Sequence, residues 1–327
     1  MPCLDHTKLN GYREYCLAHL LLSTIAHSFV WQEGEVGVPK VLPRCIAVPW
    51  YHVSEYLGLK PVYCCLDMLA NWHYASRKSP LDMICHVPGS PRTEWYNHVA
   101  VQVELEHACV FKYFIKAFDS VESGDNTGLV SALASIEDTI QRMEDTLSML
   151  HEKLDPYAFY KILRPFYEGW GSHTPLLPKG LIYEGVKKAP LHYLGCSAGH
   201  SPIVQAFDTV LGIKHTKDVA SHLKSMRDYM PSCHRSLLNA IATGPSLRKY
   251  VSKSTMKVKL AYNQCVIVLA DLRSYYLQIA IKFFLLQANN DLESQRLRKA
   301  AKSKGDKALM KHLRGARDGT VANILPV

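Results

Sequence analysis

The chain has 327 residues, of which 48% are hydrophobic and 20% charged, so it can bury a large core as one big domain or two unequal ones. Ten cysteines without a C-x-x-C pair and sixteen histidines without an H-x-x-x-H pair argue against a disulfide framework and a protein-built metal cage. The net charge is +9, and residues 291–327 supply +5 of it through nine Lys/Arg against four Asp/Glu.

No leader pattern is present, and the most apolar run, YYLQIAIKFFLLQA at 275–288, is too short to cross a membrane. The basic tail lacks the interleaved aromatic residues and the surrounding fold of a nucleic-acid site. We therefore expect a cytoplasmic protein that binds neither membranes nor nucleic acids, with a solvated, partly helical tail.

Two regions are expected along the chain. Residues 1–95 are predicted to form a partial small domain of short helices and a connecting loop, because residues 73–95 carry three prolines and little periodicity. Residues 96–327 are predicted to form a large helical domain that ends in the basic tail. The division at residue 95 is predicted from these prolines and from the lack of helical periodicity around them.

Helical periodicity dominates the larger region. Apolar residues at 129, 133, 136, 140, 143, 147 and 150 follow the three-four spacing of one helix face. Further helices are expected at about 98–118, 202–211, 218–229 and 256–288. No comparable period-two runs follow Trp95, so the predicted fold class is all-α, a large helical bundle.

The stretch GCSAG at 195–199 fits the G-x-S-x-G pattern of a hydrolase nucleophile elbow. An elbow needs a sheet-core strand before the serine, and LHYL at 191–194 is too short and isolated for one. Asp208 lies on the helix that follows Ser197, whereas an elbow hydrolase takes its acid from a distant strand end. The small residues instead suit a backbone that passes close over a flat ligand.

Seven segments match a known family in order: LPRCIAVPWYHVSEYLGLKP, LANW, AFYKILRPFYEGW, GLIYEG, GCSAGHSPIVQAFDTVLGI, MRDYMPSCHRSLL and LRSYYLQIA. They resemble indoleamine 2,3-dioxygenases over nearly the whole chain, which starts partway into the family's small domain. The resemblance implies a monomeric, all-helical enzyme that holds haem b. Its ferrous iron and O₂ would open the indole C2=C3 bond of tryptophan or a related indoleamine, giving N-formylkynurenine for the kynurenine pathway.

The resemblance also implies a substrate site. Arg164 would hold the substrate carboxylate through two charge-assisted hydrogen bonds, and Phe159 would pack on the indole. Tyr96 and Tyr160 match further aromatic positions of the pocket. Ala100 stands where many family members have a serine.

The haem environment is implied in the same way. Ser197, Ala198 and Gly199 would form a loop over the haem. Arg273 matches a family arginine near a haem propionate, and Asp208 matches an aspartate in the same neighbourhood. Such a pair fits the rule that buried charges are compensated.

Tyr276, within LRSYYLQIA, stands where the family ordinarily has the histidine that ligates the iron. A tyrosine can ligate haem iron, but an anionic phenolate favours the ferric state, whereas O₂ binding needs ferrous iron. Two alternatives follow: Tyr276 is the ligand, or it is a core aromatic residue in a site without haem. The competing function is accordingly a non-catalytic relative, haem-binding or haem-free, that acts as a sensor or interaction protein. Tyr275 is no substitute, because adjacent helix positions point about 100° apart.

Overall fold

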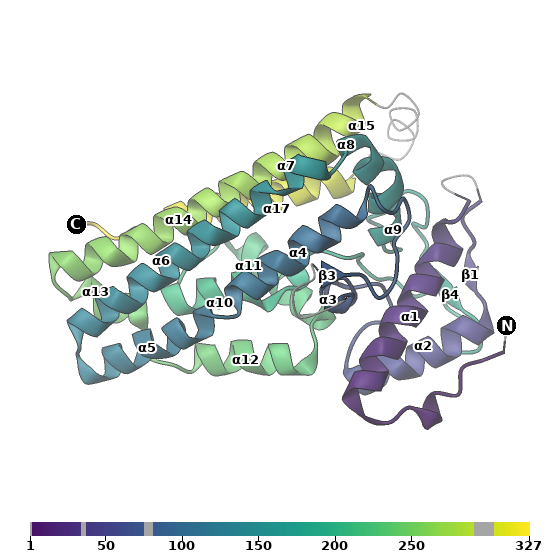
Figure 1. Cartoon of the computed structure of the whole chain (residues 1–327), viewed down its shortest axis with the longest axis horizontal. Helices are drawn as coiled ribbons and strands as arrows, with labels where there is room; N and C mark the ends of the chain where they lie inside the picture. Colours follow the sequence, from purple (N-terminus) through teal and green to yellow (C-terminus); the bar gives the residue numbers. More distant parts are fainter. Residues whose placement is uncertain (1, 34–36, 75–80, 291–303) are drawn as a thin grey trace.

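A computed structural model describes residues 2–33, 37–74, 81–290 and 304–327, with side chains for all of these except 289–290 and 304–308. The described chain is predominantly helical (Figure 1), which confirms the predicted all-α class. The strands of the described residues contain two residues each and form two small pairs. Among the described helices, none is long and apolar enough to span a bilayer.

The elements before residue 95 are short apart from two helices. In order they are η1 (His6–Lys8), α1 (Gly11–Trp31), β1 (Val41–Leu42), α2 (Arg44–Leu57), α3 (Cys65–Ala70), β2 (His73–Tyr74) and β3 (Leu81–Asp82). β2 and β3 pair antiparallel within the stretch predicted as a loop. Residues 75–80 of that stretch lie outside the described residues.

The central elements are α4 (Glu94–His107), α5 (Val110–Ser123), α6 (Asn126–Ser148), α7 (Leu150–Lys153), α8 (Pro156–Ala158), the π-helical turn η2 (Phe159–Leu163), α9 (Arg164–Tyr167), β4 (Ile182–Tyr183) and η3 (Ala198–His200). The C-terminal elements are α10 (Pro202–Leu211), α11 (Lys217–Met226), η4 (Arg227–Tyr229), α12 (Ser232–Ala242), α13 (Leu247–Ser252), α14 (Met256–Ala280), the π-helical turn η5 (Ile281–Leu286), α15 (Gln287–Asn290) and α17 (Lys304–Val321).

Two of the expected long helices differ in detail. The helix expected over 98–118 is interrupted at Ala108 and Cys109, which separate α4 from α5 although both residues keep right-handed helical dihedral angles. The helix expected over 256–288 changes to π-helical geometry at Ile281. Side-chain periodicity reports which residues face the core, so it detects neither a local break nor a widened turn.

Several separate apolar clusters hold the helices together. The largest lies between α5, α6, α10 and α14 and contains Phe114, Leu133, Phe207 and Leu269. A second joins α1 and α2 to residues after position 95, among them Trp170 and Tyr183. This second cluster therefore includes residues from both sides of the boundary at residue 95, which stays a prediction.

The C-terminal tail differs from the expectation of a solvated segment. Within residues 304–327, α17 packs along α14, where Met310 lies in one cluster with Leu277 and Ala280. Thr320 and Asn323 are also buried. The reason is the apolar face of α17, which composition alone does not reveal because the helix is rich in Lys and Arg. Residues 291–303 lie outside the described residues.

Candidate functional site

An apolar cavity of about 230 Å³ lies between α4, α14, α17 and the loop at 197–201. Leucine, valine, phenylalanine and methionine side chains supply most of its walls. Eight of the residues singled out from the sequence line it: Tyr96, Ala100, Phe159, Ser197, Ala198, Gly199, Arg273 and Tyr276. The structure thus brings most of the predicted site together, while the role of each residue stays a prediction.

One face of α4 forms a wall of this cavity. Tyr96, Ala100, Glu104 and His107 follow one another at spacings of four, four and three residues, which places them on one side of an α-helix. Tyr96 packs against Phe159 with a ring-centroid distance of 4.9 Å. The indole-packing residue expected at 159 therefore lies beside the aromatic residue expected at 96.

Tyr276 reaches the cavity from the opposite wall, α14. Its hydroxyl forms no hydrogen bond within the described part of the chain, and burial raises the pKa of the phenol to about 12. The phenol is therefore protonated at neutral pH unless a cation binds it. Tyr275 does not line the cavity and instead packs near the ring of His151 at 6.2 Å, as expected for an adjacent helix position.

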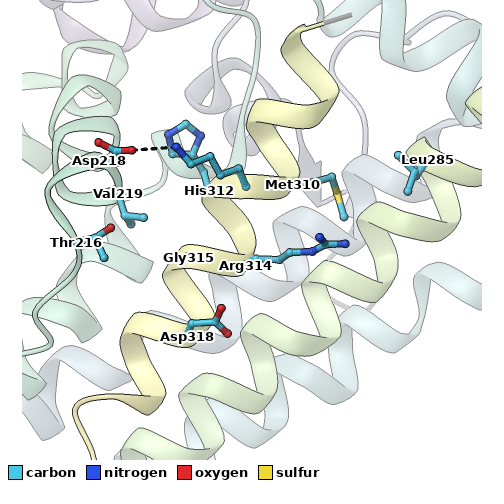
Figure 2. Close-up of a pocket in the computed structure, with 10 residues that line it drawn as sticks. Thr216, Asp218, Val219, Leu285, Met310, His312, Arg314, Gly315 and Asp318 are labelled. Atoms are coloured by element: carbon cyan, nitrogen blue, oxygen red, sulfur yellow. Dashed lines mark hydrogen bonds and ion pairs between the residues drawn. The ribbon is translucent and has the colours of Figure 1, made fainter.

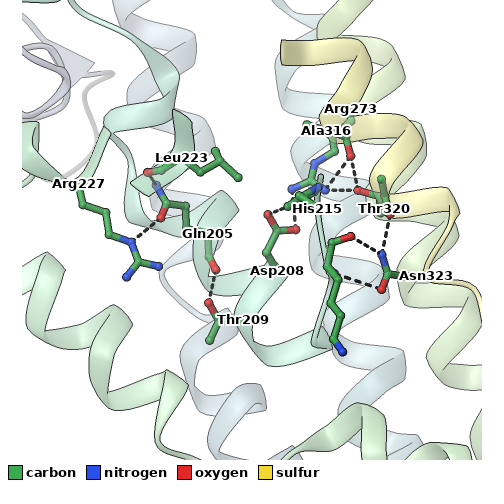
Figure 3. Close-up of polar contacts among 12 residues, drawn as sticks. Gln205, Asp208, Thr209, His215, Leu223, Arg227, Arg273, Ala316, Thr320 and Asn323 are labelled. Carbon is green, nitrogen blue, oxygen red and sulfur yellow. Dashed lines mark hydrogen bonds and ion pairs between the residues drawn. The ribbon is translucent and has the colours of Figure 1, made fainter. Parts of the chain in front are cut away.

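A buried ion pair lies at the edge of the cavity (Figure 3). Arg273 donates to Asp208 Oδ1 at 2.7 Å, and His215 Nε2 lies 2.8 Å from Asp208 Oδ2. Arg273 also donates to the hydroxyl of Thr320 on α17. Among these four residues only Arg273 lines the cavity, so Asp208 binds the arginine on the side away from the cavity.

Arg164 and Tyr160 do not line the cavity. The Arg164 guanidinium carbon lies 5.2 Å from the ring centroid of Tyr160 and 5.3 Å from that of Phe284, within the range of cation–π attraction. Phe284 does line the cavity, so its ring lies between the Arg164 guanidinium and the cavity.

The structure explains why glycines occur in the 195–199 loop, and this explanation is not visible in the sequence. A Cβ on Gly195 would lie 2.1 Å from the Tyr167 carbonyl oxygen, and one on Gly169 would lie 2.2 Å from that of Tyr193. Gly195 is therefore needed where two backbone segments cross, and a Cβ on Gly199 would face Met226. Ser197 caps η3 by accepting from the Gly199 amide at 3.2 Å.

Sequence reasoning also misses two polar residues of the cavity, Glu104 and His107. Glu104 accepts a hydrogen bond from the Ser201 hydroxyl at 2.5 Å, and burial raises the pKa of its carboxyl. Neither ring nitrogen of His107 has a well-aligned hydrogen-bond partner among the described residues. Their spacing from Tyr96 and Ala100 on one helix face is the signal that points to them.

Acidification from pH 7 to pH 5 is expected to cost about 2 kcal/mol of unfolding free energy for each of His107 and His200. Burial lowers the pKa of His107 to about 4 and that of His200 to about 3, from about 6.5 in the unfolded chain. Because the folded values are depressed, this stability is present above the unfolded pKa and is lost as the pH falls toward the folded one. Urea unfolding at both pH values measures the loss, which His107→Phe and His200→Phe should each reduce by about 2 kcal/mol. An acid-induced loss of the same size in both variants would contradict this assignment.

A second cavity of about 520 Å³ adjoins the first and lies between α11, α17 and Leu285 of η5 (Figure 2). None of the residues predicted for the site lines it, and its polar wall includes Lys311 and Asp218, which pair at 3.0 Å. His312 lines both cavities and stacks on His222 at a centroid distance of 4.0 Å. Within the described residues, no group of three or more His, Cys, Asp or Glu side chains gathers as a metal site.

Comparison with known proteins shows which family the chain belongs to. The family model "Indoleamine 2,3-dioxygenase" matches residues 1–325. The chain belongs to the indoleamine 2,3-dioxygenase family. It is 37% identical over 342 residues to human "Indoleamine 2,3-dioxygenase 2", covering 99% of this chain and 83% of that relative. The mouse "Indoleamine 2,3-dioxygenase 2" is 38% identical over 295 residues, covering 88% of this chain and 73% of the relative.

The chain is also similar to proteins with another name. "Myoglobin" of Haliotis madaka is 33% identical over 322 residues, covering 98% of this chain and 84% of the relative. Membership of this family supports dioxygenase activity in general, and the predominantly helical fold of this chain agrees with that membership.

Proposed function

We propose that the chain is a haem-dependent dioxygenase that opens the indole ring of L-tryptophan, or a related indoleamine, to N-formylkynurenine. One observation carries this proposal beyond family membership: Phe159 of η2, Arg273 and Tyr276 of α14, and the 197–199 loop face one apolar cavity from three separate segments. An apolar cavity with a few convergent polar groups is the usual form of a cofactor or substrate site.

Haem fits the chemistry of this cavity. A porphyrin is a broad apolar disc with two carboxylates, and the cavity combines apolar walls with the Arg273 guanidinium at its edge. The Tyr276 hydroxyl, which forms no hydrogen bond within the described residues, offers an oxygen ligand to iron. The volume of about 230 Å³ lies below the roughly 300–1,000 Å³ of typical ligand pockets, so we expect the walls to move apart on binding.

The chain's own residues would then bind and orient the substrate. Phe159 and Tyr96 offer adjacent ring faces for the indole, and Arg164 would hold the carboxylate beyond Phe284. The apolar walls exclude water from the reacting bond. Haem, when bound, supplies the iron that activates O₂, and no residue of the chain is assigned as an acid or base.

A second candidate function is a non-catalytic relative that binds haem, or no haem, as a sensor or interaction protein. Two observations favour it. The residue at the family's ligand position is a phenol whose pKa burial raises to about 12, so binding iron as a phenolate requires the loss of a tightly held proton. Abalone relatives of similar identity carry the name myoglobin rather than that of an enzyme.

Turnover separates the two candidates. The full chain, expressed with added haem and supplied with a reductant, O₂ and L-tryptophan, is expected to form N-formylkynurenine. Product formation should scale with the haem content of the preparation and disappear without the reductant. Tight haem binding with no product would favour the non-catalytic candidate, and the absence of haem binding would contradict the proposed enzyme.

A further inference from the structure

Two π-helical turns meet at the rim of the cavity. η2 ends at Leu163, directly before Arg164, and η5 carries Phe284 at the end of α14. The two turns pack against each other. A π turn is rare, inserts one extra residue into a helix and so changes the direction of the side chains that follow, and it is frequent at functional sites.

The meeting of these turns places Arg164 against aromatic rings from both elements. Tyr160 comes from η2 and Phe284 from η5, and their ring centroids lie 5.2 Å and 5.3 Å from the guanidinium carbon. Tyr160 is buried away from the cavity, whereas Phe284 lines it. Phe284 also packs against Phe159 at a centroid distance of 5.2 Å. It is therefore the ring that joins the expected indole-packing residue to the arginine.

We propose that Phe284 is the positioning residue that holds the guanidinium of Arg164 in place beside the cavity, and thereby makes the cavity select indoles that carry a carboxylate. This inference rests on the proposed function and adds a source of its substrate preference. The guanidinium carbon lies over the Phe284 ring within cation–π range, so the ring decides where the guanidinium can hold a carboxylate. An aliphatic side chain fills the same space without attracting or orienting the cation.

Three ligands isolate the carboxylate: L-tryptophan, indole-3-propionate, which keeps the carboxylate without the amine, and tryptamine, which keeps the amine without the carboxylate. Their affinities for the full chain, expressed with added haem, are measured by titration calorimetry. Phe284→Leu is expected to weaken both carboxylate ligands by about threefold to thirtyfold and tryptamine by less than about twofold. Phe284→Tyr keeps the ring and should keep the preference.

Phe283→Leu is the matched control. Phe283 is the neighbouring aromatic residue, lines the same cavity and packs on Phe159 at 5.7 Å, but it makes no ring contact with Arg164. Its removal should weaken all three ligands by a similar factor. Should Phe284→Leu not fold, Phe284→Met, whose unbranched side chain adapts more readily to the space, gives the same comparison.

The outcomes test the positioning role of Phe284 separately from the proposed substrate class. If the wild type prefers carboxylate ligands and Phe284→Leu weakens all three equally, Phe284 is only a wall residue and the positioning role is wrong. If the wild type binds indoles without that preference, both Arg164 as clamp and Phe284 as its positioning residue are wrong. If the wild type binds none of them, the proposed substrate class fails, and this inference fails with it.

Discussion

Tyr276→His is expected to raise dioxygenase turnover by at least about tenfold, equivalent to about 1.4 kcal/mol of activation free energy. A neutral imidazole supports ferrous haem and O₂ binding, whereas a phenolate stabilises the ferric state. The position already faces the cavity from α14, so the new side chain enters the same space without a change of fold. The rate of N-formylkynurenine formation measures the effect, together with the visible spectrum of the ferrous protein.

Tyr276→Phe is the control, because it retains the ring and removes only the hydroxyl. We expect it to bind haem more weakly than the wild type, since no oxygen ligand remains at this position. If the Phe variant matches the wild type in haem affinity and rate, Tyr276 does not hold the iron, and one of the other cavity residues must.

Arg273→Ala is expected to lower the unfolding free energy by about 3–5 kcal/mol, because it leaves the buried Asp208 carboxylate without its cationic partner. Both side chains are only 9% exposed, so little water is available to replace the lost interaction. The remaining neighbour of Asp208, His215, carries a charge only when protonated. Urea unfolding at neutral pH measures the loss.

Two variants complete this test. Arg142→Ala removes an arginine that is 42% exposed and pairs with Asp138, and it should cost less than about 1 kcal/mol. Arg273→Leu combined with Asp208→Leu removes both charges and should recover most of the stability lost by Arg273→Ala. A loss below about 1 kcal/mol in Arg273→Ala would mean that the buried pair contributes little.

The helical class and the gathering of the site follow from the sequence to a large extent. Helix α10 begins and ends where its proline, apolar spacing and Gly212 predict. The residues carried over from the family mostly line one cavity, and most of them lie on segments that resemble the family.

What the sequence does not predict are features that depend on two segments at once. The need for Gly195 arises only where the chain crosses Gly169, and the contacts of Arg164 with Tyr160 and Phe284 arise only where two π turns meet. His107 looks like one polar residue among many until α4 places it on the cavity wall. Periodicity describes one helix at a time, so these pairings need the folded arrangement.

The visible absorption spectrum of the full chain after titration with haem is the most direct test of haem binding through Tyr276. If Tyr276 holds the iron, one haem binds saturably per chain, with a shifted Soret band and a phenolate charge-transfer band that Tyr276→Phe removes. A Soret band identical to that of free haem at every ratio, or a bound spectrum that Tyr276→Phe leaves unchanged, would contradict it.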